Sequence, residues 1–132
     1  MSVFVDTSAV LAFLDADDSC HARAREAWKR LLGEDEELVT TSYVLVETYA
    51  LVQSRLGTAA VQVLAEEIAP LLRVRWLDEG MHGLALSAML AAARRKLSLV
   101  DCASFAVMHE LGLRRALAFD EHFRERGCEL VA

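Results

Sequence analysis

Residues 1–8, Met1-Ser2-Val3-Phe4-Val5-Asp6-Thr7-Ser8, give the clearest indication of the fold that we expect. Residues 3–5 form an apolar run of β-branched and aromatic side chains, which suits a strand buried on both faces of a parallel sheet. Asp6 ends this run, and open α/β sheets bind their ligands in the crevice beyond the carboxyl ends of the strands. Asp6 or Ser8 can also simply cap the following helix. The stretch alone therefore leaves a chemical and a structural role open.

The rest of the chain alternates between short apolar runs and longer segments with helical spacing. Besides 3–5, the pattern predicts strands at residues 38–40, 74–77, 116–119 and 128–131. It predicts helices at residues 8–14, 19–32, 42–56, 58–72, 79–96, 98–111 and 121–126. Strands that alternate with helices predict an α/β fold with a parallel sheet of about five strands, covered on both faces. No repeat, low-complexity tract or linker divides the chain, so we expect residues 1–132 to form one domain.

The composition describes a compact globular protein: 55% of the 132 residues are hydrophobic and 26% are charged. A formal net charge of −6 argues against a protein that coats nucleic acid through charge alone. It does not exclude an enzyme that meets nucleic acid through metal ions and a local basic patch. The apolar runs are far shorter than the roughly 20 residues of a membrane span, and no signal peptide is visible. The three widely spaced cysteines fit reduced thiols, so we expect a cytoplasmic protein that does not enter a membrane.

Four acidic residues stand at positions where they can carry chemistry. Asp6 and Asp120 follow predicted strands, and Glu47 and Asp101 lie in early turns of predicted helices. Each has an ordinary explanation, since Glu47 can lie on a helix surface and Asp101 can form a capping box with Ser98. If the strand ends converge, the four can instead form a carboxylate cluster, the ligand set of Mg²⁺ or Mn²⁺.

The sequence contexts of these acids, in this order and separation, resemble those of the PIN-domain nucleases. The contexts are VDTSA at residues 5–9, VETYAL at 46–51, SLVDCASFAVM at 98–108 and ALAFDEHF at 116–123. The best match is to the compact toxins of toxin–antitoxin pairs, the VapC type, and the resemblance extends from Val3 to Val131. It implies a three-layer α/β/α sandwich and a metal-dependent endoribonuclease. The implied catalytic and metal-binding residues are Asp6, Glu47, Asp101 and Asp120, with Mg²⁺ or Mn²⁺ as cofactor.

The resemblance also implies partners and substrate contacts. An RNA substrate and a cognate antitoxin are expected, and a homodimer through residues 58–72 or 81–93 is expected because these segments carry much apolar surface. The antitoxin is expected to reach the acidic site through an Arg or Lys. Thr7 or Ser8 would lend a hydroxyl at the edge of the site. The sequence departs from the family just before Asp120, where members often carry a threonine and this chain has Ala118 and Phe119.

Basic residues precede the Asp101 segment and could guide RNA phosphates toward the metal. These residues are Arg94, Arg95 and Lys96. They can equally close the preceding helix and complement the negative end of its dipole. The four histidines are interpreted as surface or packing residues, although His122 is nearest to a predicted acid. They are His21, His82, His109 and His122.

Other α/β proteins fit the sequence less well. A dinucleotide-binding domain would need a Gly-x-Gly-x-x-Gly turn after the first strand, where VDTSAV has no glycine. A phosphoacceptor or phosphatase domain generally pairs its acid with a neighbouring Asp and a later lysine, whereas Asp120 is followed by Glu121. A non-catalytic PIN-like module that binds RNA or protein remains the alternative. The four acids argue against it, because clustered carboxylates without a metal are costly.

Overall fold

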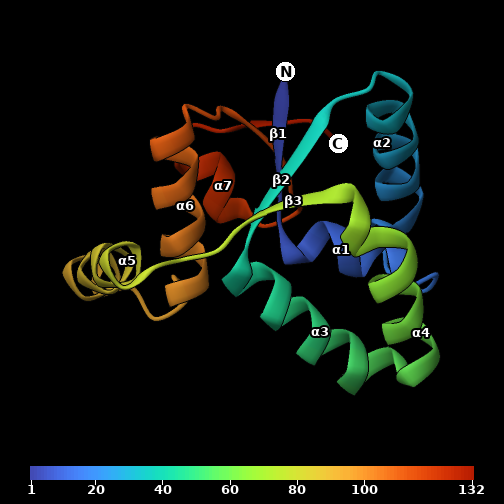
Figure 1. Cartoon of the computed structure of the whole chain (residues 1–132), viewed down its shortest axis with the longest axis horizontal. Helices are drawn as coiled ribbons and strands as arrows, with labels where there is room; N and C mark the ends of the chain where they lie inside the picture. The colour runs from blue at the N-terminus through green and yellow to red at the C-terminus, as the bar shows by residue number, and fades with distance from the viewer.

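The computed structural model describes all residues, Met1–Ala132, and contains a sheet of five parallel strands (Figure 1). The strands lie in the order β3-β2-β1-β4-β5. Their bounds are β1 Ser2–Val5, β2 Glu37–Thr41, β3 Leu72–Arg75, β4 Arg115–Leu117 and β5 Glu129–Leu130. The central strand β1 pairs with both β2 and β4. Its residues 3–5 are fully buried, which confirms the prediction from the opening stretch.

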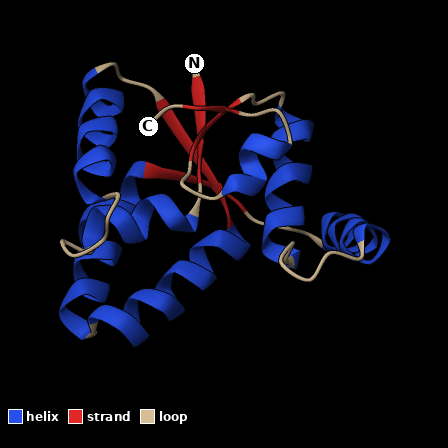
Figure 2. Ribbon diagram, turned by 180° about the vertical axis from the view of Figure 1, so that it is seen from behind, coloured by secondary structure: helices blue, strands red, loops and turns tan.

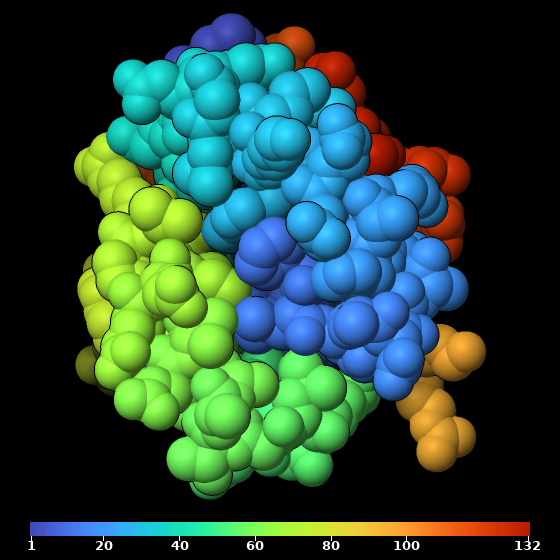
Figure 3. Space-filling model, turned by 90° about the vertical axis from the view of Figure 1, so that its right-hand side faces the viewer, coloured from blue at the N-terminus to red at the C-terminus, as the bar shows by residue number.

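The chain has seven α-helices, and Figure 2 shows from behind that helices flank the sheet on two sides. They are α1 Thr7–Leu14, α2 His21–Gly33, α3 Ser42–Leu56, α4 Thr58–Val63, α5 Glu79–Ala92, α6 Leu99–Leu111 and α7 Glu121–Glu125. Helices α1, α2 and α4 lie on one side of β1, and α6 and α7 lie on the other (Figure 1). Figure 3 shows α1 in dark blue between α2 in light blue and, in green, α4 and the residues that follow α4. The expected three-layer α/β/α sandwich is confirmed.

The alternation of side chains along β1 builds two separate cores. Val3 and Val5 pack with the core that contains Trp28 of α2. Phe4 points to the opposite face, where its ring stacks on Phe123 of α7 at a centroid distance of 6.0 Å. Because both faces of β1 are covered, its carboxyl end is held rigidly between the two helical layers.

The segment between α3 and β3 differs from the single helix predicted over residues 58–72. Helix α4 ends at Val63, and a π-helical turn, Leu64–Ile68, and a 3-10 turn, Ala69–Leu71, follow. Pro70 cannot donate a backbone hydrogen bond and clashes with the preceding turn, so an α-helix cannot continue through it. The strand that follows begins at Leu72, two residues earlier than predicted, and pairs in register with β2. It ends before Trp76, whose side chain is exposed.

Helix α5 is shorter than predicted and ends at Ala92. The next residue, Ala93, has a φ of 50° and breaks the helix. Residues 94–96 therefore lie in the loop between α5 and α6, and the interpretation that they close the helix is wrong. Helix α5 packs mainly on α6 and projects from the rest of the molecule (Figures 1 and 2). None of the helices is both long and apolar enough to cross a membrane.

Candidate active site

Three of the four predicted acids come together at the carboxyl ends of the central strands. Asp6 directly follows β1, and Asp120 lies three residues beyond β4, the parallel neighbour of β1. Asp101 enters from the first turn of α6. Both Asp101 and Asp120 lie close enough to Asp6 to raise its pKa by charge repulsion. The fold thus assembles three carboxylates that are far apart in the sequence.

Asp6 is held in place by Ser8. The Ser8 hydroxyl donates a hydrogen bond of 2.6 Å to Asp6 Oδ2, and the Ser8 backbone N–H donates a second of 3.1 Å to the same oxygen. Ser8 Oγ in turn accepts a hydrogen bond of 2.9 Å from the backbone N–H of Phe119, at the end of β4. The only hydroxyl proton of Ser8 is directed to Asp6. In this arrangement Ser8 positions the acid and has no proton left for a substrate phosphate.

Burial makes the ionised form of Asp6 unfavourable. Only 4% of the residue is exposed. This burial, opposed by the hydrogen bonds from Ser8 and reinforced by the charges of Asp101 and Asp120, raises the pKa of Asp6 from 3.8 to about 6. A bound cation would favour the ionised form and offset each of the unfavourable contributions. A cation beside Asp6 would therefore lower its pKa again.

Asp101 combines its capping role with a place in the site. Its backbone N–H donates to Ser98 Oγ at 3.1 Å, and its Oδ2 accepts from the Ser98 backbone N–H, also at 3.1 Å. This capping box agrees with the structural explanation considered for Asp101 in the sequence. Because the cap uses only Oδ2, the other carboxylate oxygen is not engaged by it. The two roles are compatible, and the cap fixes the direction of the carboxylate.

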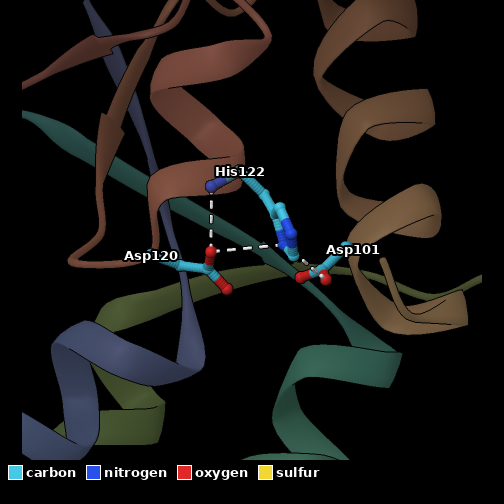
Figure 4. Close-up of side chains that lie close together, drawn as sticks. All are labelled: Asp101, Asp120 and His122. Carbon is cyan, nitrogen blue, oxygen red and sulfur yellow. Dashed lines mark hydrogen bonds and ion pairs between the residues drawn. The ribbon is translucent and has the colours of Figure 1, made fainter. Parts of the chain in front are cut away.

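His122 lies beside two of these acids and is not merely the surface or packing residue that the sequence suggests. Its Nδ1 lies 3.3 Å from Asp101 Oδ2 and 3.3 Å from Asp120 Oδ1 (Figure 4). One ligand atom from each of these three residues lies within 4.8 Å of the others. The backbone N–H of His122 donates a hydrogen bond of 2.9 Å to Asp120 Oδ1, so Asp120 also caps the N-terminus of α7 (Figure 4). The sequence signal for this position of His122 is that it lies two residues after Asp120, an acid at a strand end.

Glu47 is near this site but is not part of the close group formed by Asp101, Asp120 and His122. It lies in α3, half-buried, and no hydrogen bond or ion pair engages its carboxylate. The hydroxyl oxygen of the next residue, Thr48, lies 3.0 Å from the hydroxyl oxygen of Thr7, the residue after Asp6. The structure thus brings the backbone around Glu47 beside that around Asp6, without a contact between the two carboxylates.

A cavity lies beside His122, and we call it the basic cavity because two of its wall residues are arginines. Its volume is about 340 Å³, and its walls include His122, Arg94 and Arg126. Arg94 forms an ion pair of 3.0 Å with Glu125, and the guanidinium of Arg126 lies 4.8 Å from the centre of the Phe105 ring. Arg126 was not singled out in the sequence, because a lone arginine after a short helix carries no motif. The other two predicted basic residues, Arg95 and Lys96, are exposed and form no ion pair.

This chain is similar to known proteins in both sequence and fold. The 23S rRNA-specific endonuclease VapC20 of Mycobacterium tuberculosis is 33% identical over 126 residues, which cover 95% of this chain and 94% of the relative. A crystal structure of M. tuberculosis VapC20, described as a sarcin-ricin loop cleaving toxin, superposes with a TM-score of 0.82 over 96% of this chain and 95% of that one.

A second solved structure, FitAcB from Neisseria gonorrhoeae, has a TM-score of 0.70 and covers 100% of this chain and 97% of its own. Its sequence identity of 16% limits this likeness to the fold. The family model of the PIN domain matches residues 3–127, nearly the full length that carries the sheet and the acids. By this match and by the identity to VapC20, the chain belongs to the PIN-domain family.

Proposed function

We propose that residues 1–132 act as a single-domain, metal-dependent endoribonuclease, the toxin of a toxin–antitoxin pair. The observation that carries this proposal is the convergence of three acids at the carboxyl end of the sheet: Asp101 and Asp120 lie in one close group with His122, and their charges help to raise the pKa of Asp6. The relatives support the reaction, since VapC20 is named an endonuclease specific for 23S rRNA and a toxin that cleaves the sarcin-ricin loop. A non-catalytic binding module is not favoured, because it would gain nothing from a buried, repelled carboxylate such as Asp6.

The residues present fit a divalent cation. Asp6, Asp101 and Asp120 supply carboxylate oxygens, the ligands that Mg²⁺ and Mn²⁺ prefer, and the raised pKa of Asp6 reflects a charge that a cation would balance. We assign the metal to these three acids together with Glu47. When bound, Mg²⁺ or Mn²⁺ would supply a Lewis acid at the scissile phosphate and lower the pKa of a water molecule.

The chain's own residues hold the carboxylates ready for this ion. Ser8 occupies one oxygen of Asp6, which leaves Oδ1 for the metal. Ser98 fixes the direction of Asp101. Because these contacts exist before any ligand binds, little side-chain ordering remains to be done when the RNA arrives. Glu47 has no partner and is free to turn toward the ion from α3.

RNA would reach the site over the basic residues of the α5–α6 loop. Arg94, Arg95 and Lys96 form this approach, and we add Arg126, which lines the cavity next to His122 with Arg94. Phosphate contacts of this kind position a nucleic acid without reading its sequence. They provide local attraction in a protein whose net charge of −6 is otherwise unfavourable for RNA. By analogy with VapC20, we propose a structured ribosomal RNA as the substrate.

The partners that we propose are a second copy of the chain and a cognate antitoxin. Of the two segments expected to form the homodimer, the one with α5 has the more exposed leucine side chains. Leu84 is 63% exposed and Leu90 is 68% exposed, and Trp76, just before the helix, is 65% exposed. A helix that projects from the body with such residues is suited to pack on its own copy. The antitoxin would act in the cytoplasm and place an Arg or Lys among the acids.

The proposal is tested by incubating the protein with RNA and Mg²⁺ or Mn²⁺, with and without a chelator. Cleavage is expected only with metal, and Asp101→Asn is expected to abolish it while circular dichroism shows an unchanged fold. Asp17→Asn is the matched control, because Asp17 is exposed in the turn after α1. Cleavage that survives the chelator, or that persists in Asp101→Asn, contradicts the proposed mechanism.

A further inference from the structure

The position of Nδ1 of His122 is not explained by hydrogen bonding. This nitrogen is fully buried and makes no hydrogen bond. It lies 3.3 Å from one oxygen of Asp101 and 3.3 Å from one oxygen of Asp120, but neither contact has hydrogen-bond geometry. Buried polar atoms are rarely left without a partner in a folded protein. An unpartnered nitrogen between two carboxylates calls for a further group at this point.

Packing accounts for the burial of the ring but not for the direction of this nitrogen. The side chain of His122 is 13% exposed and forms part of the wall of the basic cavity. Figure 4 shows the edge that carries Nδ1 directed between Asp101 and Asp120, so this nitrogen faces both carboxylates.

The distances are those of neighbouring ligands of one ion. Two ligand atoms at about 2.1 Å from an octahedral metal and at right angles to each other stand about 3 Å apart. Both separations of Nδ1 from the carboxylate oxygens are 3.3 Å, and the three ligand atoms lie within 4.8 Å of one another. Only a small adjustment of the side chains would let Nδ1, Asp101 and Asp120 share one cation.

We propose that His122 is a nitrogen ligand of the divalent ion, through Nδ1, beside Asp101 and Asp120. This inference rests on the proposed metal-dependent function and names a residue outside its carboxylate set. It has a consequence for the choice of metal. Mg²⁺ is held mainly by oxygen ligands and water, whereas imidazole is a good ligand for transition metals. A site with His122 therefore selects Mn²⁺ over Mg²⁺ more strongly than carboxylates alone would.

The test compares metal binding by the intact chain with that of His122→Gln. His109→Gln is the matched control, because His109 is exposed on α6 and contacts none of the acids. Mn²⁺ affinity is measured from the electron paramagnetic resonance signal of free Mn²⁺, and Mg²⁺ affinity by competition. Pulsed spectra of bound Mn²⁺ report a directly coordinated nitrogen through its nuclear modulation. Metal-free thermal melts of both variants establish that they fold.

The unaltered chain is expected to show nitrogen modulation from bound Mn²⁺, and His122→Gln to lose it. The variant is expected to bind Mn²⁺ about 10-fold to 100-fold more weakly, the range typical when a residue that supports a metal site is removed. The change in Mg²⁺ affinity is expected to be much smaller. The control is expected to match the unaltered chain in all three measurements.

Other results overturn the inference. Bound Mn²⁺ without nitrogen modulation, or equal Mn²⁺ affinity in His122→Gln, shows that His122 is no ligand, while the proposed nuclease stands. Tighter binding of both metals in His122→Gln shows that the histidine competes with the ion. Failure of the unaltered chain to bind Mn²⁺ or Mg²⁺ at all removes the proposed metal dependence as well. Should His122→Gln fail to fold, the nitrogen modulation of the unaltered chain decides alone.

Discussion

Replacement of Asp6 by asparagine should stabilise the metal-free protein. Asp6 is 4% exposed and carries its charge near Asp101 and Asp120. Both hydrogen bonds from Ser8 end on the same oxygen, Oδ2, so the amide oxygen of an asparagine can accept them. The amide nitrogen then replaces Oδ1 and faces carboxylates instead of adding a third negative charge. The variant keeps the local structure and removes the repulsion.

The raised pKa of Asp6 sets the size of this effect. Its pKa rises from 3.8 in the reference state to about 6 in the folded protein. A difference of about two pKa units corresponds to about 3 kcal/mol between the two states at pH 7. This is an upper figure, because the asparagine must still be desolvated. A gain of even about 1 kcal/mol raises the melting temperature of a domain of this size by several degrees.

The effect should depend on pH in a defined direction. The folded protein holds the Asp6 proton up to about pH 6, whereas the unfolded chain releases it near pH 3.8. Between these values the folded state binds more protons, so the Asp6 contribution to stability is favourable at low pH and is lost as the pH rises through 6. The stability difference between Asp6→Asn and the unaltered chain should therefore be small below pH 4 and largest above pH 6.

Thermal melts in a chelator at several pH values measure this difference, and repeats with added Mn²⁺ measure metal binding. Mn²⁺ should stabilise the unaltered chain more than Asp6→Asn, because the proposed ion binds the native state and has Asp6 among its proposed ligands. Asp17→Asn, in an exposed turn, should change neither quantity. The reasoning is refuted if Asp6→Asn melts at or below the unaltered chain at pH 7 without metal, or if the difference does not grow with pH.

Three further outcomes are expected from single features of the structure. Ser8→Ala should raise the pKa of Asp6 above 6, because it removes the hydroxyl bond that lowers this pKa, and a carbon-detected NMR titration of the carboxyl measures it. Ala93→Gly should stabilise the chain by about 1 kcal/mol in urea denaturation, because Ala93 has a φ of 50°, which costs an L-residue more than glycine. Leu84→Glu with Leu90→Glu should yield a monomer in light scattering at concentrations where the unaltered chain is a dimer; an unaltered chain that is monomeric at tens of micromolar contradicts the proposed interface.

Much of the fold is determined locally and could be predicted from the sequence. Residues 3–5 are apolar at every position, and such a run is stable only between two covering layers, which is where β1 lies. Asp6 and Asp120 could be placed at strand ends because each directly follows or closes an apolar run. The capping box of Ser98 and Asp101 is a contact between residues three positions apart, so its pattern is readable in the sequence.

Other features were decided by contacts between distant residues. The end of β3 depends on its register with β2, which has no local signal in the sequence. The hydroxyl of Ser8 is held beside Asp6 because its oxygen accepts a hydrogen bond from the backbone N–H of Phe119, 111 residues away in the sequence.

The same holds for the place of His122 in the site. A parallel sheet with acids at its strand ends can be predicted from the residues alone. The packing of α6 and α7 brings Asp101 Oδ2 and His122 Nδ1 to within 3.3 Å, and neither Asp6 nor Glu47 joins the close group that these residues form with Asp120. The physical reason is that side-chain convergence depends on how helices pack across the sheet, through contacts that no short stretch of sequence contains.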